Sequence, residues 1–210
     1  MTTPVSDIAF TPAVKALQTR YGSRDAYDRM ERNGGWAMTV TPELAAFIAE
    51  RDSFYLGTAN AEGQPYIQHR GGPKGFLKIL DECTLAFADF RGNKQYITVG
   101  ALVENDKAFI FLMDYVNRHR IKIWGRARVV EADEALMMQL ADPKYTGRPE
   151  RAIVFRIEVW DANCPQHITP RYTEDEIATH IQALHDRIAS LETENRALRE
   201  AVTTRRQPRG

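Results

Sequence analysis

Cationic side chains and glycines occur together where apolar segments of this chain end, and this combination suits the binding of a phosphate group. Arg70 and Lys74 flank two glycines, Gly71 and Gly72, just before the apolar run 76–80. Guanidinium and ammonium groups make charge-assisted hydrogen bonds to phosphate oxygens. We therefore expect an anion to bind near this turn.

A second basic turn consists of Arg91, Gly92, Asn93 and Lys94, and it leads into a predicted helix over 94–103. Backbone N–H groups at the start of a helix favour a nearby anion. Two such turns on neighbouring strands predict one phosphate site. The alternative is a pair of solvated basic turns on an ordinary β-protein, because single phosphate motifs often match by chance.

The composition describes a globular chain without a charge bias. Among 210 residues, 43% are apolar, and 28 acidic residues balance 28 basic ones, so the usual electrostatic pattern of a nucleic-acid-binding protein is missing. The two cysteines are too few for a disulfide framework, and the five histidines lack the spacing of metal ligands, so we expect no metal site. No segment has the pattern of a signal peptide or a membrane span, so we expect a cytoplasmic location.

The pattern of apolar residues and turns predicts a mainly β (α+β) fold. An N-terminal arm over 1–40 carries one helix near 12–21 and is otherwise expected to be irregular. Strands are expected at 54–58, 65–70, 76–80, 84–88, 107–113, 120–130 and 152–160, with short helices at 41–51, 94–103 and 133–140. Six or seven strands in mainly hairpin order predict a closed or half-closed antiparallel barrel over 41–172.

Residues 53–172 resemble the pyridoxamine 5'-phosphate oxidase-like family. The resemblance rests on the two basic turns and on residues 119–127, which read HRIKIWGRA. Members of that family fold as antiparallel split β-barrels and form homodimers with two FMN molecules at the subunit interface. The resemblance therefore implies FMN as the cofactor and a second copy of the chain as a partner.

The same resemblance implies the residues of the flavin site. The residues matched to the phosphate contacts are Arg70, Lys74, Arg91, Asn93 and Lys94, and those matched to the strand beside the flavin are Phe87, Ala88 and Asp89. Arg120 matches a residue that reaches the isoalloxazine, and Lys122 lies on the same side of its strand because side chains alternate. Trp160 and Arg171 match residues that contact the flavin from the partner subunit.

One departure from the family concerns the vitamin substrate. True pyridoxamine phosphate oxidases have an Arg-Leu-His-Asp run before the last arginine, where this chain has His167, Ile168, Thr169 and Pro170. Thr169 cannot replace an imidazole, so we do not expect oxidation of vitamin B6. The substrate site differs while the flavin site is kept.

The segment 173–204 predicts a coiled-coil helix, followed by a basic tail over 205–210. Heptad a positions are Ile181, Ile188, Asn195 and Val202, and d positions are Ile177, Leu184, Leu191 and Leu198. β-Branched residues at a, mainly Leu at d and one Asn at a favour two parallel strands. The pairs Arg187–Glu192 and Glu194–Arg199 would be attractive between two copies. The alternatives are a helix docked on its own barrel, and a helix that pairs with another protein.

We expect an FMN-dependent oxidoreductase that transfers hydride or electrons to or from a small organic molecule. No side chain is a clear catalytic acid or base, which suits an enzyme whose cofactor supplies the chemistry. The alternative is a split barrel that binds flavin or haem without turnover, with His69 or His167 as a haem ligand. Two further alternatives remain: the cofactor is a deazaflavin in place of FMN, or the barrel only carries the coiled coil.

Overall fold

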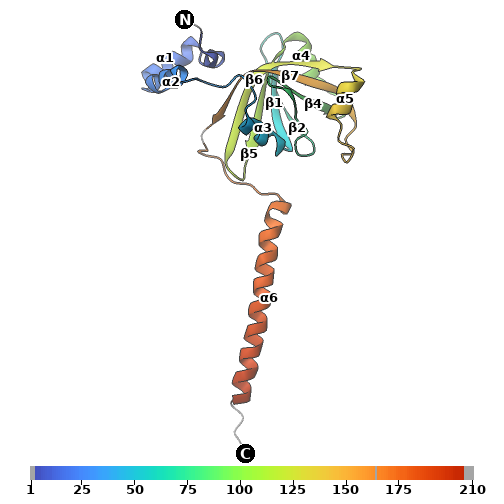
Figure 1. Cartoon of the computed structure of the whole chain (residues 1–210). Helices are drawn as coiled ribbons and strands as arrows, with labels where there is room; N and C mark the ends of the chain where they lie inside the picture. The colour runs from blue at the N-terminus through green and yellow to red at the C-terminus, as the bar shows by residue number, and fades with distance from the viewer. Residues whose placement is uncertain (1–2, 164, 206–210) are drawn as a thin grey trace, which may run out of the picture. The chain divides into compact units, whose positions relative to one another are not determined.

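The computed structural model describes residues 3–163 and 165–205, which form one β-sheet and several helices (Figure 1). The strands of these residues are β1 (Ser53–Ala59), β2 (Pro65–Gly71), β3 (Lys78–Asp81), β4 (Thr84–Phe90), β5 (Lys107–Asp114), β6 (His119–Val130) and β7 (Pro149–Asn163). The helices are η1 (Val5–Ile8), a 3₁₀ helix, and α1 (Pro12–Arg20), α2 (Arg24–Arg32), α3 (Pro42–Ala49), α4 (Ile97–Glu104), α5 (Glu134–Leu140) and α6 (Glu174–Arg205).

The seven strands form a single sheet in the order β2-β1-β5-β6-β7-β4-β3, and all neighbouring strands are antiparallel. This confirms the predicted mainly β, antiparallel fold. The register between β6 and β7 shifts at Gly125, where an added Cβ would lie 2.1 Å from the carbonyl oxygen of Arg156. Only glycine fits there, and such a bulge bends the strand.

The sheet curls so that strands far apart in its order come into contact. Phe54 of β1 lies 5.1 Å from Phe87 of β4 between ring centroids, although β5, β6 and β7 lie between these strands in the sheet. Phe76, in the turn before β3, stacks on Phe54 at 5.4 Å. The two edge strands, β2 and β3, are not paired with each other. The sheet is therefore a half-closed barrel, consistent with the split-barrel fold.

The core is made by alternate strand residues and by one face of α3. Leu56, Ile110 and Ile123 are fully buried, and Leu44 and Ile48 of α3 pack into the same cluster. The Thr41 hydroxyl caps α3 by accepting from the Leu44 N–H at 3.3 Å, as the sequence predicts. β3 begins two residues later than expected, because Phe76 and Leu77 are buried in the turn that precedes it.

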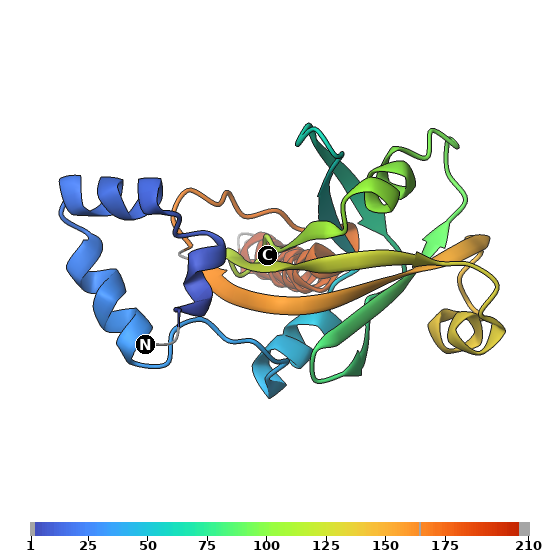
Figure 2. The same cartoon turned by 90° about the horizontal axis from the view of Figure 1, so that it is seen from above.

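The N-terminal arm is more helical than its sequence predicts. α1 lies at the expected position, but residues 24–32, expected to be irregular, form α2. No residue of α2 is buried, and only Ala26, Tyr27 and Met30 of its nine residues are apolar, so its sequence gives only a weak sign of a packed helix. Figure 2 shows these blue helices beside one end of the long β6–β7 ribbon.

The described chain divides into two compact units, with the boundary between Ile168 and Thr169. The second unit consists mainly of α6, whose start is held by Thr173 and Glu176. The Glu176 N–H donates to the Thr173 hydroxyl at 3.3 Å, and the Thr173 N–H donates to the Glu176 carboxylate at 2.8 Å. Residues 206–210 of the predicted basic tail lie outside the described residues. A search of the described helices finds none long and apolar enough to cross a membrane.

Candidate functional site

An open cavity of about 220 Å³ lies where β2 and β4 end and α4 begins. It brings together four residues that the sequence predicts for the flavin site: Arg70, Asp89, Asn93 and Lys94. Arg70 comes from the end of β2 and Asp89 from the end of β4, while the other two lie in the turn that leads to α4. The two basic regions of the sequence therefore meet at one place.

The backbone of this turn leaves the start of α4 without a cap. Lys94 and Tyr96 have φ angles of 61° and 56°, in the left-handed region that few side chains tolerate. No side chain caps α4, and its first turn carries no acidic residue. The first N–H groups of a helix have no acceptor within the helix. Ile97 and Thr98, whose N–H groups are among these donors, line the cavity.

Two guanidinium groups converge on one buried carboxylate beside the cavity. Arg70 Nη1 donates to Asp89 Oδ1, and Arg151 Nε lies 3.7 Å from Asp89 Oδ2. The three side chains are 17%, 11% and 11% exposed in the order Arg70, Asp89, Arg151. The Arg70 Nε is buried and makes no hydrogen bond, so the contact with Asp89 does not satisfy every donor of this guanidinium.

Arg151 also supports the turn from behind. Its guanidinium lies 5.2 Å from the ring centroid of Tyr96, the residue that immediately precedes α4. Its Nη2 lies 3.0 Å from the Glu150 carboxylate, which lines the cavity. Asp89, Arg151 and Tyr96 thus form one connected group beneath the start of α4.

Two of the predicted phosphate contacts do not line this cavity. Lys74 lies 3.8 Å from the carboxylate of Glu50, and both side chains are mostly exposed. Arg91 lies 3.8 Å from the carboxylate of Glu150. Each cation is therefore paired with a carboxylate, and neither lines the cavity.

The strand residues Phe87 and Ala88 are buried on β4. Phe87 is fully buried among core aromatic rings, and Ala88 packs in a second apolar cluster beneath α5. Both side chains are buried in apolar clusters, and neither residue lines the cavity. Of this predicted segment, only Asp89 presents its side chain to the cavity.

None of the predicted contacts of the flavin ring lines the α4 cavity. Arg120 and Lys122 alternate with buried Ile121 and Ile123, so both project from the outer face of β6. Lys122 Nζ lies 2.9 Å from Asp161 Oδ2. Trp160 donates its Nε1–H to the Thr39 carbonyl oxygen at 2.8 Å. Arg171 belongs to the second unit, described by itself.

Sequence reasoning missed several residues of the cavity: Tyr66, Gln68, Tyr96, Thr98, Glu150 and, behind it, Arg151. Tyr66 and Gln68 share one face of β2 with Arg70, so the period-two alternation of a strand would have identified them. Glu150 and Arg151 begin β7 and reach the site through the pairing of β7 with β4. No local pattern in the sequence reveals that pairing.

The family model described as pyridoxamine 5'-phosphate oxidase matches residues 40–164, which is more than half of the chain. The chain therefore belongs to this family. The match includes the whole sheet and every residue of the α4 cavity. No curated protein matches the chain.

Several solved structures are similar to this chain at low identity. HupZ from Group A Streptococcus is 17% identical with a TM-score of 0.49, over 63% of this chain and 99% of that one. An FMN-binding protein from Syntrophomonas wolfei is 15% identical with a TM-score of 0.45, over 70% and 97%. A protein from Clostridium acetobutylicum related to general stress protein 26 is 16% identical with a TM-score of 0.45, over 64% and 94%.

Proposed function

We propose that the chain binds FMN and that the FMN phosphate lies at the start of α4, between Arg70 and Lys94. The observation that carries this proposal is the uncapped, left-handed turn in a cavity that both Arg70 and Lys94 line. A phosphate dianion would accept from the N–H groups of α4 and from both cations. The donor set therefore fits the group that the family's cofactor presents.

The carboxylates near the cavity do not oppose an anion, because each is already paired. Asp89 is held by Arg70 and Arg151, and Glu150 is held by Arg91 and Arg151. Asp89 fixes the plane of the Arg70 guanidinium, which leaves its remaining donors directed elsewhere. We infer that Asp89 orients Arg70 rather than contacting the cofactor.

When bound, FMN supplies hydride or electron transfer with a small organic substrate, which makes this chain an oxidoreductase in our proposal. The residues of the chain bind the phosphate and orient the cofactor. Arg120, Lys122, Trp160 and Arg171 stay predictions as contacts of the flavin ring. The substrate and the cytoplasmic location are likewise predictions.

We also propose that the barrel forms a homodimer through the outer face of β1, β2 and β5. Tyr55 is paired with Phe111, and Phe109 lies 6.3 Å from Phe111 between ring centroids, so these three rings lie on neighbouring strands opposite the core side. Ile67 on β2 is 69% exposed and belongs to the same face. An apolar sheet face of this extent is typical of an interface.

A second homodimer contact is proposed for α6 as a parallel coiled coil. Six of its predicted a and d side chains are 38% to 63% exposed: Ile177, Ile181, Leu184, Ile188, Leu191 and Leu198.

A cysteine at Asn195 would lie at the a–a′ contact of two parallel chains. We expect Asn195→Cys chains to crosslink under mild oxidation and Thr193→Cys chains, with the cysteine at the solvent-facing f position, not to do so.

The FMN proposal is tested on the purified full-length chain. Its absorption spectrum and the mass of any molecule released by heat identify the cofactor. We expect Lys94→Ala to weaken FMN binding about tenfold or more, and Arg91→Ala less than about threefold, since only Lys94 lines the cavity. Lys107→Ala on β5 is the control. Equal losses for Lys94 and Arg91, or a chain that takes up haem but no flavin, would contradict the proposal.

A further inference from the structure

A second cavity, of about 460 Å³, lies between the N-terminal helices and the outer face of β6 and β7. It shares no lining residue with the α4 cavity. Aromatic rings from both sides form its walls, and the only charged side chains among its lining residues are Lys122 and Asp161. Its volume lies within the range of roughly 300 to 1,000 Å³ that is usual for small-molecule pockets.

The aromatic rings of this cavity pack on one another rather than in the barrel core. Trp36 stacks on Trp124 at 4.9 Å between centroids, with 11° between the ring planes. Phe10 lies 5.0 Å from both Trp36 and Tyr27. All four rings keep part of their surface exposed to solvent. They therefore form a wall that is fixed in position and still accessible.

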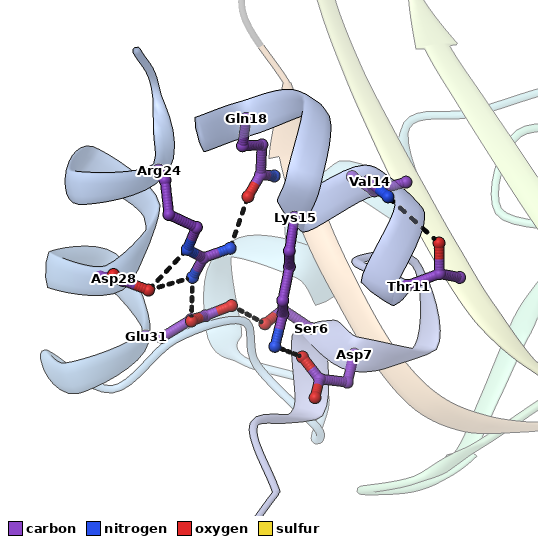
Figure 3. A network of polar contacts seen from close by, with 9 residues as sticks. All are labelled: Ser6, Asp7, Thr11, Val14, Lys15, Gln18, Arg24, Asp28 and Glu31. Carbon is purple, nitrogen blue, oxygen red and sulfur yellow. Dashed lines mark hydrogen bonds and ion pairs between the residues drawn. The ribbon is translucent and has the colours of Figure 1, made fainter. Parts of the chain in front are cut away.

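A polar network holds the arm in this shape, as Figure 3 shows. The Arg24 guanidinium donates to Gln18 of α1 and to Asp28 and Glu31 of α2. Glu31 in turn accepts from the Ser6 hydroxyl of η1 at 2.7 Å, and Ser6 is only 1% exposed. One guanidinium thus connects three elements, and a fully paired network of this kind rigidifies its surroundings.

The arm does not complete the barrel. None of the described residues 3–39 belongs to the buried core clusters of the sheet. The arm instead carries its own buried polar network and covers two strands at their outer face. The arm is thus rigid, contributes nothing to the core clusters and closes one side of an aromatic cavity. These are the properties of a binding-site wall.

We propose that this cavity binds a neutral, mainly aromatic molecule that carries one hydroxyl group. Lys122 Nζ lies 2.9 Å from Asp161 Oδ2, so the two opposite charges neutralise each other. The ammonium has further donors and the carboxylate has further acceptors, so a hydroxyl that both donates and accepts satisfies the pair. A charged ligand would meet a like charge in this pair, which disfavours its binding.

The cavity does not suit a cationic ligand for a second reason. Lys122 Nζ already lies 5.5 Å from the Trp36 ring and 5.3 Å from the Trp124 ring. The indole faces that would attract an external cation therefore already hold an internal one. This site goes beyond the proposed FMN function and does not depend on the phosphate site at α4, and it assigns Lys122 to this cavity in place of the predicted contact with the flavin ring.

The test uses 2-naphthol as the probe, titrated calorimetrically into the full-length chain with and without FMN. We expect one 2-naphthol to bind per chain, unaffected by FMN, and to bind at least about tenfold more tightly than naphthalene-2-carboxylate or 2-naphthylmethylammonium. Trp36→Ala should weaken it about tenfold or more, whereas Tyr21→Ala, an exposed ring outside the cavity, should leave it unchanged.

Asp161→Asn separates this proposal from a simple folding defect. With the carboxylate removed, Lys122 is left with an unbalanced charge, so naphthalene-2-carboxylate should bind more tightly to this variant than to the natural chain. Damage to the fold would not produce that gain. No 2-naphthol binding up to about 1 mM, or equal binding by the Trp36→Ala chain, would overturn the proposal. Displacement of 2-naphthol by FMN would do so too, because the cavity would then belong to the flavin ring.

Discussion

The starts of α4 and α6 are built in opposite ways. α6 begins with Thr173 and Glu176, which satisfy each other's backbone N–H groups, and its first turn is acidic. α4 begins at the left-handed Tyr96, with no side-chain cap and no acidic residue in its first turn. α6 is complete at its start and exposes an apolar stripe along its length. α4 is packed along its length and open at its start.

The other α-helices of the described residues show that the open start is unusual for this chain. The hydroxyls of Thr11 and Thr41 cap α1 and α3, and the Asp133 carboxylate caps α5. α2 lacks a side-chain cap but has Asp25 in its first turn. Only α4 has neither. Each α-helix of the described residues therefore has a side-chain cap or an acidic residue in its first turn, except the helix that begins beside Arg70.

The open start also carries a conformational cost. A left-handed conformation costs a non-glycine residue about 1 to 2 kcal/mol, and both Lys94 and Tyr96 adopt it. Strain of this kind persists where the surrounding structure enforces it, and it is concentrated at functional sites. Here the surroundings include the Arg151 guanidinium against the Tyr96 ring. The turn is thus held in the conformation that leaves N–H groups directed outward.

The largest expected effect concerns the exposed stripe of α6. Leu191→Lys removes a d-position side chain from each chain of the proposed coiled coil and places like charges opposite each other. We expect a loss of about 2 to 5 kcal/mol per chain. The melting of α6, followed by far-ultraviolet circular dichroism, should lose its dependence on protein concentration. Thr193→Lys, at the f position, should melt like the natural chain, and equal melting of all three would contradict the coiled coil.

The next effect tests the open start of α4. The double variant Arg70→Ala with Lys94→Ala removes two charge-assisted contacts to the phosphate, each worth about 1.5 to 3 kcal/mol. FMN affinity, measured by quenching of flavin fluorescence, should fall at least about 100-fold. The matched change at the closed start, Thr173→Ala, should leave FMN affinity unchanged. A double variant that keeps its affinity would show that the phosphate lies elsewhere.

A smaller effect is expected when α4 is given an acid of its own. Tyr96→Asp places a carboxylate at the position of an N-cap, where it competes with phosphate for the same N–H groups. We expect the Tyr96→Asp chain to bind FMN about tenfold more weakly than the Tyr96→Asn chain, because asparagine has a similar shape to aspartate and no charge. Equal affinities for these two variants would show that charge at the start of α4 does not matter.

Removal of the cap from α6 has a modest expected cost. Thr173→Ala deletes the hydroxyl that accepts from Glu176 and should lower the stability of the helix by about 1 kcal/mol. The melting temperature of α6 reports this change. Thr193→Ala, in the helix interior, is the control, and a melting temperature that falls no further in Thr173→Ala than in this control would argue against the cap.

The smallest effect is a titration at the start of α3. The Thr41 hydroxyl and the Glu43 N–H both hydrogen-bond the Glu43 carboxylate and lower its pKa below the usual value. Because the pKa is lower in the folded chain, this contribution to stability is present above the ordinary pKa of glutamate and is lost as pH falls through the folded pKa. An NMR titration should show the lowered pKa, and Thr41→Ala should raise it toward the ordinary value.

Local signals in the sequence predicted much of the fold. Thr41 before Pro42, and Thr173 before three acidic residues, marked helix starts that the structure contains. Alternation of apolar residues predicted β5 and β6 to within a residue. These features depend on neighbouring residues only. α2 was missed because only three of its nine residues are apolar, and Arg24 with its polar partners holds the helix in place.

The candidate site was predictable in part, for the same physical reason. The basic turns around Arg70 and Lys94 were predicted from residue type to form one site, and both residues line the α4 cavity. Lys74 and Arg91 were grouped with them, but Lys74 lies beside the Glu50 carboxylate and Arg91 beside the Glu150 carboxylate, and neither cation lines the cavity. Arg151 was not recognised, because its role depends on the pairing of β7 with β4. Contacts of this kind are set by register and curl of the sheet.

The most direct test of the open helix start compares FMN with riboflavin, which lacks the phosphate. Both are titrated into the natural chain and into Lys94→Ala, with Lys107→Ala as the control. We predict that the natural chain binds FMN at least about 100-fold more tightly than riboflavin, and that Lys94→Ala reduces this ratio about tenfold or more without changing riboflavin affinity. Equal affinity of the natural chain for the two flavins would contradict a phosphate site at α4.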